Sequence, residues 1–570
     1  MDLSAAKPWL KFYGKTPAKL NYPSATTYQM IAAVAQTYPD NTAYIFMGKQ
    51  TKYSAFLSRV NAAARGLYHM GIRKGDRVTI CMPNTPQAVD CFYALNRIGA
   101  VANMIHPLSA PKEIAFYLKA SQSKAILTLD QFYYKVEEIL PELEEKPAIL
   151  IARISEELPF PLDLLYPFSE SGKAVRRLPR KGYTYWTDMI AKGRHSHLPK
   201  HDGRFSDCAA ILYSGGTTGT TKGILLSNLN FNALAMQTVA ASGFGSVAGM
   251  KMLSIMPVFH GFGLGIGIHT ALTGGAACIL VPQFSVKVYS DTLLKYRPEL
   301  IPGVPTLFEA LLRAEDLREA DLSFLKGIFC GGDSLSTELK KKVDAFLKAH
   351  GCTEQIREGY GTTECVTASC LTPKDYAREG SIGIPFPDTY YKIVKPGTNN
   401  ERLAGMEGEI CVSGPTIMMG CMDNPDETAS AVRRHEDDRL WLHTGDLGHM
   451  DEDGFIYFHQ RLKRMIISSG YNIYPSQLEN IIDSHEKVLL SCVIGVKDDY
   501  RGQKVRAYVV PIPGIEPTDA LKDELMAHCA RHIAKYACPR EIEFRTELPK
   551  TLVGKVAYRV LEEEAAANEV

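Results

Sequence analysis

Through its first 400 residues the chain alternates helical stretches with short apolar segments. The apolar run Asp76–Pro83 (DRVTICMP) is followed by the helical stretch Gln87–Ala100, and a further apolar run begins at Val101. The segment Ser123–Asp130 (SKAILTLD) repeats the strand pattern. Alternation of this kind is typical of parallel sheets covered by helices. We therefore predict an α/β fold in which layered parallel-sheet subdomains make up a large N-terminal domain.

The pattern changes after about residue 400, where short strands are separated by glycine turns, as in Gly408–Pro415 (GEICVSGP) and Gly454–Gln460 (GFIYFHQ). We expect a small β-rich subdomain there. Beyond Arg464 the order becomes helix, strand, strand, helix, which predicts a separate α+β C-terminal domain of about 105 residues. A chain of 570 residues exceeds what one hydrophobic core supports, so more than one domain is expected.

The amino-acid composition indicates which class of partner and which cellular compartment to expect. The chain has 64 basic and 63 acidic residues, and this balance gives no support for a nucleic-acid partner. Its 13 cysteines show neither a C-x-x-C pair nor zinc-ligand spacing, which favours reduced thiols in a cytoplasmic protein. The first fifteen residues, MDLSAAKPWLKFYGK, lack the apolar run of a signal peptide.

One apolar segment is long enough to span a bilayer. Residues 262–281 (FGLGIGIHTALTGGAACILV) contain no Asp, Glu, Lys or Arg. Five glycines interrupt the segment, however, and Gly274-Gly275 divides it into a helical half and a strand-like half. We therefore predict a buried helix, turn and strand in place of a membrane span.

The segment 154–204 mixes proline, aromatic residues and a basic cluster without clear periodicity. The basic residues are Arg176, Arg177, Arg180 and Lys181. One interpretation is a solvated loop insertion. The other is a surface element that contacts acidic lipid headgroups or lipid-delivered substrate, which would give the protein a peripheral membrane contact.

The stretch Tyr213–Gly223 (YSGGTTGTTKG) concentrates groups that bind phosphate. It contains four glycines, four threonines and one lysine. A Walker loop requires glycine before the lysine and Ser or Thr after it, whereas Lys222 lies between Thr221 and Gly223. The composition still predicts an anion site, because glycines let backbone N–H groups approach phosphate oxygens while hydroxyls and the ammonium group add donors. A glycine- and threonine-rich hairpin turn is the alternative.

Two further glycine-containing stretches favour a nucleotide. In Ile328–Ser336 (IFCGGDSLS) an apolar strand enters Gly331-Gly332, where a flat ligand could approach the backbone, and Ser334 or Ser336 could cap the helix that follows. In Gly359–Glu364 (GYGTTE) an aromatic face precedes two hydroxyls and a carboxylate. A carboxylate beside phosphate-binding threonines suits Mg²⁺.

Three further stretches contain charged residues that could contact a ligand. Asp446 lies in a glycine-flanked turn (WLHTGDLG), where a carboxylate can accept hydrogen bonds from vicinal hydroxyls, as in ribose recognition, or can form an Asx turn. Arg461, with Lys463 and Arg464, forms a basic cluster at the junction of the predicted domains. Lys555 follows Gly554 in a turn that could deliver its charge to a distant site, although a surface lysine is the simpler interpretation.

These six stretches, in this order over residues 213–558, resemble the adenylate-forming (AMP-binding) superfamily of acyl-CoA synthetases. The family's usual loop reads YTSGTTGxPKG, whereas this chain has Gly215 and Thr221 at the serine and proline positions. These departures, with Pro302–Leu312 (PGVPTLFEALL) and His106–Leu118 (HPLSAPKEIAFYL), look most like bacterial long-chain fatty acid–CoA ligases.

The resemblance implies a two-step reaction. A carboxylate attacks the α-phosphate of ATP to give acyl-adenylate and pyrophosphate, and the thiol of coenzyme A then attacks the adenylate to give a thioester and AMP. Substrates and cofactors would therefore be ATP, Mg²⁺, coenzyme A and a carboxylic acid. MPVFHGFG (Met256–Gly263) resembles the family's aromatic-gate stretch, and Gly263, Gly265 and Gly267 leave room behind the gate, which favours a long acyl chain. Medium-chain, aromatic and sterol-type acids stay open as alternatives.

The resemblance also assigns residue roles. Catalytic residues would be Lys555, bridging the carboxylate and the α-phosphate, His260, beside the carboxylate, Thr363, contacting phosphate, and Glu364, binding Mg²⁺. The β- and γ-phosphates would be held by Thr217, Thr218, Gly219 and Lys222. The adenine would be held by Gly331, Gly332, Asp333 and Tyr360, with Gly361 also contacting the nucleotide, and the ribose by Asp446 and Arg461.

The resemblance further implies that the small C-terminal domain is mobile and rotates between the two steps. The expected parts are an N-terminal adenylation domain (1–461), a hinge (462–465) and a C-terminal lid domain (466–570). Rotation would bring Ser469, Gly470 and Tyr471 to the coenzyme A channel. Here the pivot is Arg464, where the family usually has Asp or Lys, and Gln460 replaces the usual glycine before Arg461.

Two other functions stay open on the sequence alone. One is an acyl-AMP ligase that transfers the acyl group to a separate carrier protein. The other, from a different class, is a non-catalytic ATP-binding sensor. The presence together of Lys222, Glu364, Asp446 and Lys555 favours an enzyme. The oligomeric state is not predicted.

Overall fold

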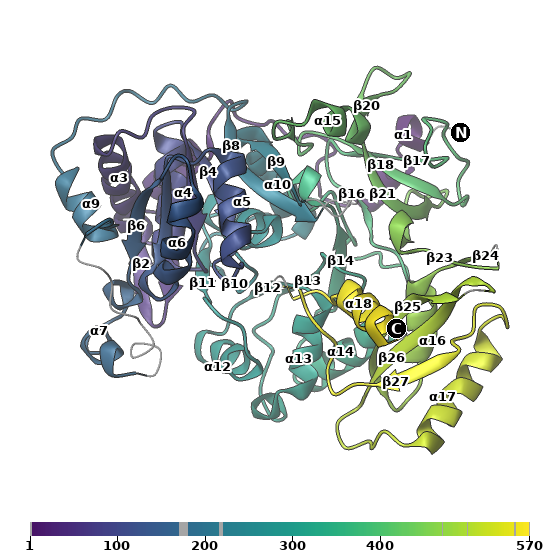
Figure 1. Ribbon diagram of the computed structural model, residues 1–570. Coiled ribbons are helices and arrows are strands. Elements are labelled where there is room, and N and C mark those ends of the chain that lie inside the picture. Colours follow the sequence, from purple (N-terminus) through teal and green to yellow (C-terminus); the bar gives the residue numbers. More distant parts are fainter. Residues whose placement is uncertain are drawn as a thin grey trace.

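The computed structural model describes residues 3–169, 181–215, 221–469, 471–498, 500–551 and 554–568. Figure 1 shows two helix-covered sheets in purple to teal, a β-rich body in green and a yellow C-terminal domain beneath it. The prediction of an α/β protein with layered parallel sheets, a β-rich subdomain and an α+β C-terminal domain is confirmed.

The first sheet has strand order β19-β9-β8-β4-β3-β5-β6-β7. Its strands from β8 to β7 pair in parallel, whereas β9 pairs antiparallel with both β8 and β19. The bounds are β3 Arg77–Cys81, β4 Val101–Ile105, β5 Ala125–Leu129, β6 Ala148–Ala152, β7 Thr184–Tyr185, β8 Cys208–Gly215, β9 Thr221–Ser227 and β19 Gly420–Cys421.

The second sheet has strand order β16-β15-β14-β13-β12-β10-β11-β1-β2, parallel from β14 to β1 and antiparallel at both ends. The bounds are β1 Thr42–Phe46, β2 Lys49–Lys52, β10 Lys251–Ser254, β11 Ala277–Leu280, β12 Leu300–Gly303, β13 Gly327–Cys330, β14 Ile356–Tyr360, β15 Cys370–Leu371 and β16 Ile384–Pro385. One continuous hydrophobic core joins both sheets to the helices between them.

The helices begin where the sequence supplies caps. Thr85 accepts a hydrogen bond from the N–H of Ala88 ahead of Pro86, and Ser336, one of the two predicted caps, accepts from Leu339. The main N-terminal helices are α2 Thr27–Thr37, α3 Tyr53–His69, α4 Pro86–Arg97, α5 Pro111–Ser121, α6 Tyr133–Ile139, α9 Trp186–Lys192, α10 Asn228–Ser242, α12 Val286–Tyr296, α13 Pro305–Arg313, α14 Thr337–Ala349 and α15 Pro425–Ala431.

The apolar segment 262–281 folds as predicted, as a buried helix, a glycine turn and a strand. A π-helical stretch covers Phe262–Thr270, α11 covers Ala271–Thr273, and β11 follows the turn at Gly274-Gly275. A Cβ at Gly263 would lie 2.0 Å from the carbonyl oxygen of Pro257, so close packing requires glycine here. Among the described residues, no helix is long and apolar enough to cross a membrane.

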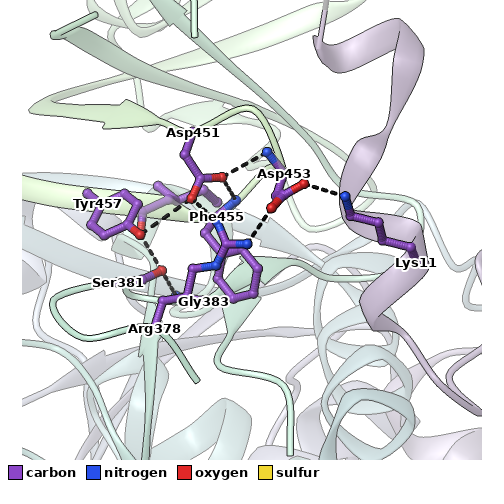
Figure 2. Close-up of polar contacts among 9 residues, drawn as sticks. Lys11, Arg378, Ser381, Gly383, Asp451, Asp453, Phe455 and Tyr457 are labelled. Atoms are coloured by element: carbon purple, nitrogen blue, oxygen red, sulfur yellow. Dashed lines mark hydrogen bonds and ion pairs between the residues drawn. The ribbon is translucent and has the colours of Figure 1, made fainter. Parts of the chain in front are cut away.

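The β-rich subdomain is an antiparallel sheet of β17 Tyr390–Val394, β18 Gly408–Ser413, β20 Val432–Arg434, β21 Leu440–Met450 and β22 Ile456–Arg461. Figure 2 shows how the turn of the β21–β22 hairpin is anchored: Arg378 forms ion pairs with Asp451 and Asp453, and Lys11 also pairs with Asp453. The guanidinium carbon of Arg378 also lies 4.2 Å from the ring centroid of Phe455. Two segments distant in the sequence, which carry Lys11 and Arg378, therefore fix this hairpin in place.

The C-terminal domain is a mixed sheet flanked by helices on both faces. Its strands are β23 Ile466–Ser468, β24 Tyr471–Ile473, β25 Val488–Asp498, β26 Gly502–Pro511 and β27 Glu541–Phe544. The helices α16 (Pro475–Asp483) and α17 (Asp519–His532) pack on one face, and α18 (Tyr558–Asn568) packs on the other. Alternate residues of β25 and β26 supply the two cores, as the two-residue period of a strand requires.

Candidate active site

The glycine-containing stretches after β13 and β14 lie side by side. These strands are parallel neighbours, with Cys330 opposite Glu358, so the loops that leave their carboxyl ends emerge at the same edge of the sheet. A Cβ at Gly331 would lie 2.8 Å from the carbonyl oxygen of Gly359, and one at Gly361 would lie 2.3 Å from that of Thr367. Glycine is therefore required at Gly331 for the loop after β13 to approach β14, and at Gly361 for the loop after β14 to fold back on itself.

Asp446, Arg461 and Tyr360 form one polar group beside this edge. Asp446 and Arg461 face each other across the β21–β22 ladder, with 3.6 Å between Arg461 Nε and Asp446 Oδ1. The hydroxyl of Tyr360 donates to Asp446 Oδ2 at 2.7 Å. Burial raises the pKa of Asp446, although the charge of Arg461 opposes that effect. The hydroxyl of Tyr360, a residue predicted to hold the adenine, is thus bonded to the carboxylate predicted to bind the ribose.

A buried hydrogen-bond network supports the turn that carries Asp446. Glu409 accepts from the N–H of Gly445 at 3.1 Å through Oε1, and its Oε2 lies 3.1 Å from Nδ1 of His443. His435 Nε2 lies 3.0 Å from His443 Nε2. With Cys411, the Glu409 and His443 ligand atoms are close enough to be considered for a metal. Because the carboxylate and imidazole already satisfy each other, we interpret the group as a positioning network.

Lys555 reaches this edge from the C-terminal domain. Lys550 bridges to Val556, the N–H of Gly554 donates to the carbonyl of Thr551 at 2.9 Å, and Gly554 has φ of 82°, as in a turn. The hydroxyl of Thr306, in the first turn of α13, donates to the carbonyl of Gly554 at 2.7 Å. A Cβ at Gly332 would lie 3.7 Å from Cε of Lys555. The turn therefore places an ammonium group against one of the predicted nucleotide glycines.

Burial and the neighbouring charges have opposing effects on the pKa of Lys555. Burial lowers the pKa of Lys555, and the carboxylates of Asp333, Asp446 and Glu364 oppose this. His260 lies close enough to be affected: burial and the Lys555 charge lower its pKa to about 3. His260 is therefore neutral at pH 7, and its Nδ1 accepts a hydrogen bond from the N–H of Phe262 at 3.2 Å.

Only some of the residues predicted to bind phosphate and Mg²⁺ lie among the described residues. Glu364 accepts from the hydroxyl of Ser214 at 3.3 Å, and Thr363 begins a short 3₁₀ turn, Thr363–Cys365. Thr217, Thr218 and Gly219 lie outside the described residues. Oxygen ligands beside hydroxyl donors fit Mg²⁺ at Glu364 by their chemistry.

Lys222 has a partner that the sequence analysis missed. Its ammonium group forms an ion pair with Glu427, in the first turn of α15. The stretch NPDET does contain a readable signal: Asn424 accepts from the N–H of Glu427 at 3.0 Å, and proline follows at the first helical position. The signal predicts a helix start, but it does not show that the helix faces a lysine about 200 residues earlier in the chain.

Arg464, at the domain junction, contacts residues of the C-terminal domain. The guanidinium group of Arg464 pairs with Glu479 of α16 and lies 5.0 Å from the ring centroid of Tyr558. Gln460 is buried within β22, paired with Leu447, so this position belongs to the sheet.

Ser469 and Gly470 are among the residues predicted to meet coenzyme A. Ser469 is exposed and has φ of 51°, and Gly470 lies outside the described residues. Figure 1 places the β23–β24 hairpin, which flanks them, at the outer edge of the C-terminal domain.

The sequence pattern of the AMP-binding enzyme family matches residues 31–421. The pattern of the AMP-binding enzyme C-terminal domain matches residues 477–555. These two ranges contain every predicted site residue except Asp446, Arg461, Ser469 and Gly470, which lie between them.

Curated relatives align over almost the entire chain. A long-chain-fatty-acid–CoA ligase of Bacillus subtilis (strain 168) is 35% identical, with 99% of each chain covered. A protein of the same name from Yersinia pestis is 32% identical, with 98% of each covered. The solved structure of the anthranilate CoA ligase AuaEII in complex with anthranoyl-AMP superposes with a TM-score of 0.83 at 23% identity, covering 97% of this chain and 99% of that one.

Proposed function

We propose that this chain, which belongs to the AMP-binding enzyme family, is an acyl-CoA synthetase that acts on a medium- or long-chain fatty acid. As a member of that family it uses ATP, Mg²⁺ and coenzyme A. The observation that carries the proposal is the approach of Lys555 to Gly332, beside the Asp446–Arg461 pair. The substrate class is supported by relatives of known name, which align over 98% or more of this chain.

In the first step, two anions must approach each other. The fatty-acid carboxylate attacks the α-phosphate of ATP, the bond to pyrophosphate breaks, and acyl-adenylate forms. Lys555 supplies a fixed positive charge between the two reactants, and neutral His260 adds no charge of its own. Mg²⁺, held by Glu364, would neutralise charge on the polyphosphate. Asp446, fixed by Tyr360 and Arg461, is available to accept hydrogen bonds from ribose hydroxyls.

In the second step, the thiolate of coenzyme A attacks the acyl carbonyl carbon and AMP leaves. Lys555 has no necessary part in that attack, because the carboxylate charge that it offsets is lost when the adenylate forms. We propose that the C-terminal domain rotates about 462–465 to carry Ser469 and Gly470 to the thiol channel. The contact of Arg464 with Glu479 supports a pivot that moves with the C-terminal domain.

The substrate class is tested by pyrophosphate release with a panel of acids from acetate to palmitate and oleate, including benzoate. We expect the highest kcat/KM with medium or long aliphatic chains. A preference for benzoate or acetate would contradict the assignment. Transfer to a carrier protein is not favoured, since these relatives are named as CoA ligases.

We also propose a peripheral membrane contact by the segment 154–204, of which 154–169 and 181–204 are described. The helical turns α7 (Leu162–Leu165) and Tyr166–Phe168 expose large apolar side chains. Phe160 is 80% exposed, Leu164 63% and Phe168 74%. Exposed apolar residues this close together favour an interaction surface over a plain solvated loop. The basic residues Arg176, Arg177 and Arg180 lie outside the described residues.

Replacing Phe160, Leu164 and Phe168 together by serine is expected to reduce sedimentation with anionic phospholipid vesicles by about tenfold, because buried apolar area is lost. Activity on fatty acid in detergent solution should be unchanged. The matched control replaces Leu403, Met406 and Leu440, which are exposed apolar residues of the β-rich subdomain. Equal sedimentation of all three proteins would contradict the proposed contact.

A further inference from the structure

Five residues meet where the β-rich subdomain faces the C-terminal domain. They are Glu407, His449, His459, Tyr474 and Ser476. The first three belong to the N-terminal domain, in the approach to β18, on β21 and on β22, whereas Tyr474 and Ser476 lie at the start of α16. We call this group the interdomain latch.

Two hydrogen bonds of the latch cross between the domains. The hydroxyl of Tyr474 donates to Oε1 of Glu407 at 2.7 Å. The hydroxyl of Ser476 donates to the backbone carbonyl of His459. Both donors are therefore placed on the predicted mobile part, and both acceptors on the fixed part.

The hydrogen bonds of Glu407 fix its orientation. Carboxylate oxygens accept hydrogen bonds, so Nδ1 of His459 donates to Oε2. Nε2 of His459 in turn lies 2.9 Å from Nδ1 of His449. The His449 ring stacks on Tyr457, with 4.5 Å between ring centroids. The carboxylate thus holds a fixed orientation before Tyr474 arrives, and hydrogen bonds to a charged group are the stronger kind.

The fixed half of the latch is rigidly mounted. His449 and His459 lie on the β21–β22 hairpin, whose turn is anchored by Arg378 and Lys11 (Figure 2). The moving half is rigid too, because α16 carries Glu479, the partner of Arg464 at the junction. A hydrogen bond that joins two rigid domains forms only within a narrow range of their relative orientations.

We propose that Glu407 and Tyr474 are positioning residues that hold the C-terminal domain in the orientation where Lys555 reaches the site. The proposal rests on the proposed function, because it assumes that a second orientation serves the thioester step. Rotation of α16 away from β22 breaks both crossing bonds. Other bonds also cross between the domains, from Thr306, Thr337 and Lys342. The latch adds to them in favouring this orientation, and so shifts the relative rates of the two half-reactions.

The test measures both half-reactions in the full-length protein. We expect Tyr474→Phe to lower the ratio of adenylation rate to thioesterification rate, the latter measured with supplied acyl-AMP, by about tenfold, the usual effect of one hydrogen bond to a charged group. Glu407→Gln should act in the same direction. The matched control is Tyr500→Phe, at a tyrosine of the same domain that is 91% exposed. An unchanged ratio, including one in which both rates fall equally, overturns the proposal.

A second measurement reads orientation without any substrate. Fluorescent labels at Glu315 and Lys522, both exposed and in different domains, report the interdomain distance by energy transfer. Tyr474→Phe should raise the population of the second distance by about tenfold, and an unchanged distribution overturns the latch. If the wild type releases no pyrophosphate with any fatty acid, the proposed function fails, while this measurement still decides the latch.

Discussion

Adenylate formation is expected to fall by about 100- to 1000-fold when Lys555 is replaced by alanine, the usual loss on removing one preorganised charge. Thioester formation from supplied acyl-AMP and coenzyme A should be largely unaffected. The difference arises because only the first step brings a carboxylate to a polyphosphate, and Lys555 is the ammonium group that the structure places against Gly332. Rapid-quench measurement of each half-reaction checks the prediction.

The control for this variant is Lys550→Ala. Lys550 lies on the same turn, bridged to Val556, but its side chain is exposed. It should leave both half-reactions within about twofold of the wild type, as expected for an exposed lysine away from the site. An equal loss of both steps in Lys555→Ala would show that Lys555 stabilises the site in general and has no specific part in adenylation.

Replacing Arg464 by proline is expected to have the opposite effect, slowing thioester formation on the order of 100-fold while adenylation continues. Arg464 ends the 3₁₀ turn Leu462–Arg464, and the φ of such a turn is already close to the value that proline imposes. A rotated C-terminal domain needs a different backbone conformation at the pivot, which proline forbids. The same two half-reaction assays apply.

Arg464→Ala separates the backbone effect from loss of the side chain. It removes the ion pair with Glu479 and leaves φ free. We expect it to retain thioester formation. If alanine and proline behave alike, the effect comes from the lost guanidinium contacts. If proline abolishes adenylation and spares the second step, the pivot is not at Arg464.

The fold was largely predictable because its signals are local. Alternation of strands and helices predicted the parallel layers, and the glycines in 262–281 predicted a helix, turn and strand in place of a membrane span. Ser336 was a predicted helix cap. Each of these depends on residues close together in the chain, where steric preference and capping act directly.

The contacts that assemble the candidate site were harder to predict from the sequence. Lys222 and Glu427 form an ion pair because α15 packs near β9. The hydroxyl of Tyr360 donates to Asp446, a contact that the stacking predicted for the tyrosine ring does not indicate. The interdomain latch depends on how two domains are placed relative to each other. No period or motif in the sequence encodes such distances, so these partners had to come from the structure.

The two-step reaction is decided by the stoichiometry of the products formed from a long-chain fatty acid, ATP, Mg²⁺ and coenzyme A. We predict equal amounts of acyl-CoA, AMP and pyrophosphate, with sustained AMP release only when coenzyme A is present. Formation of ADP and phosphate, or sustained AMP release without coenzyme A, would contradict an enzyme that forms an adenylate and then a thioester.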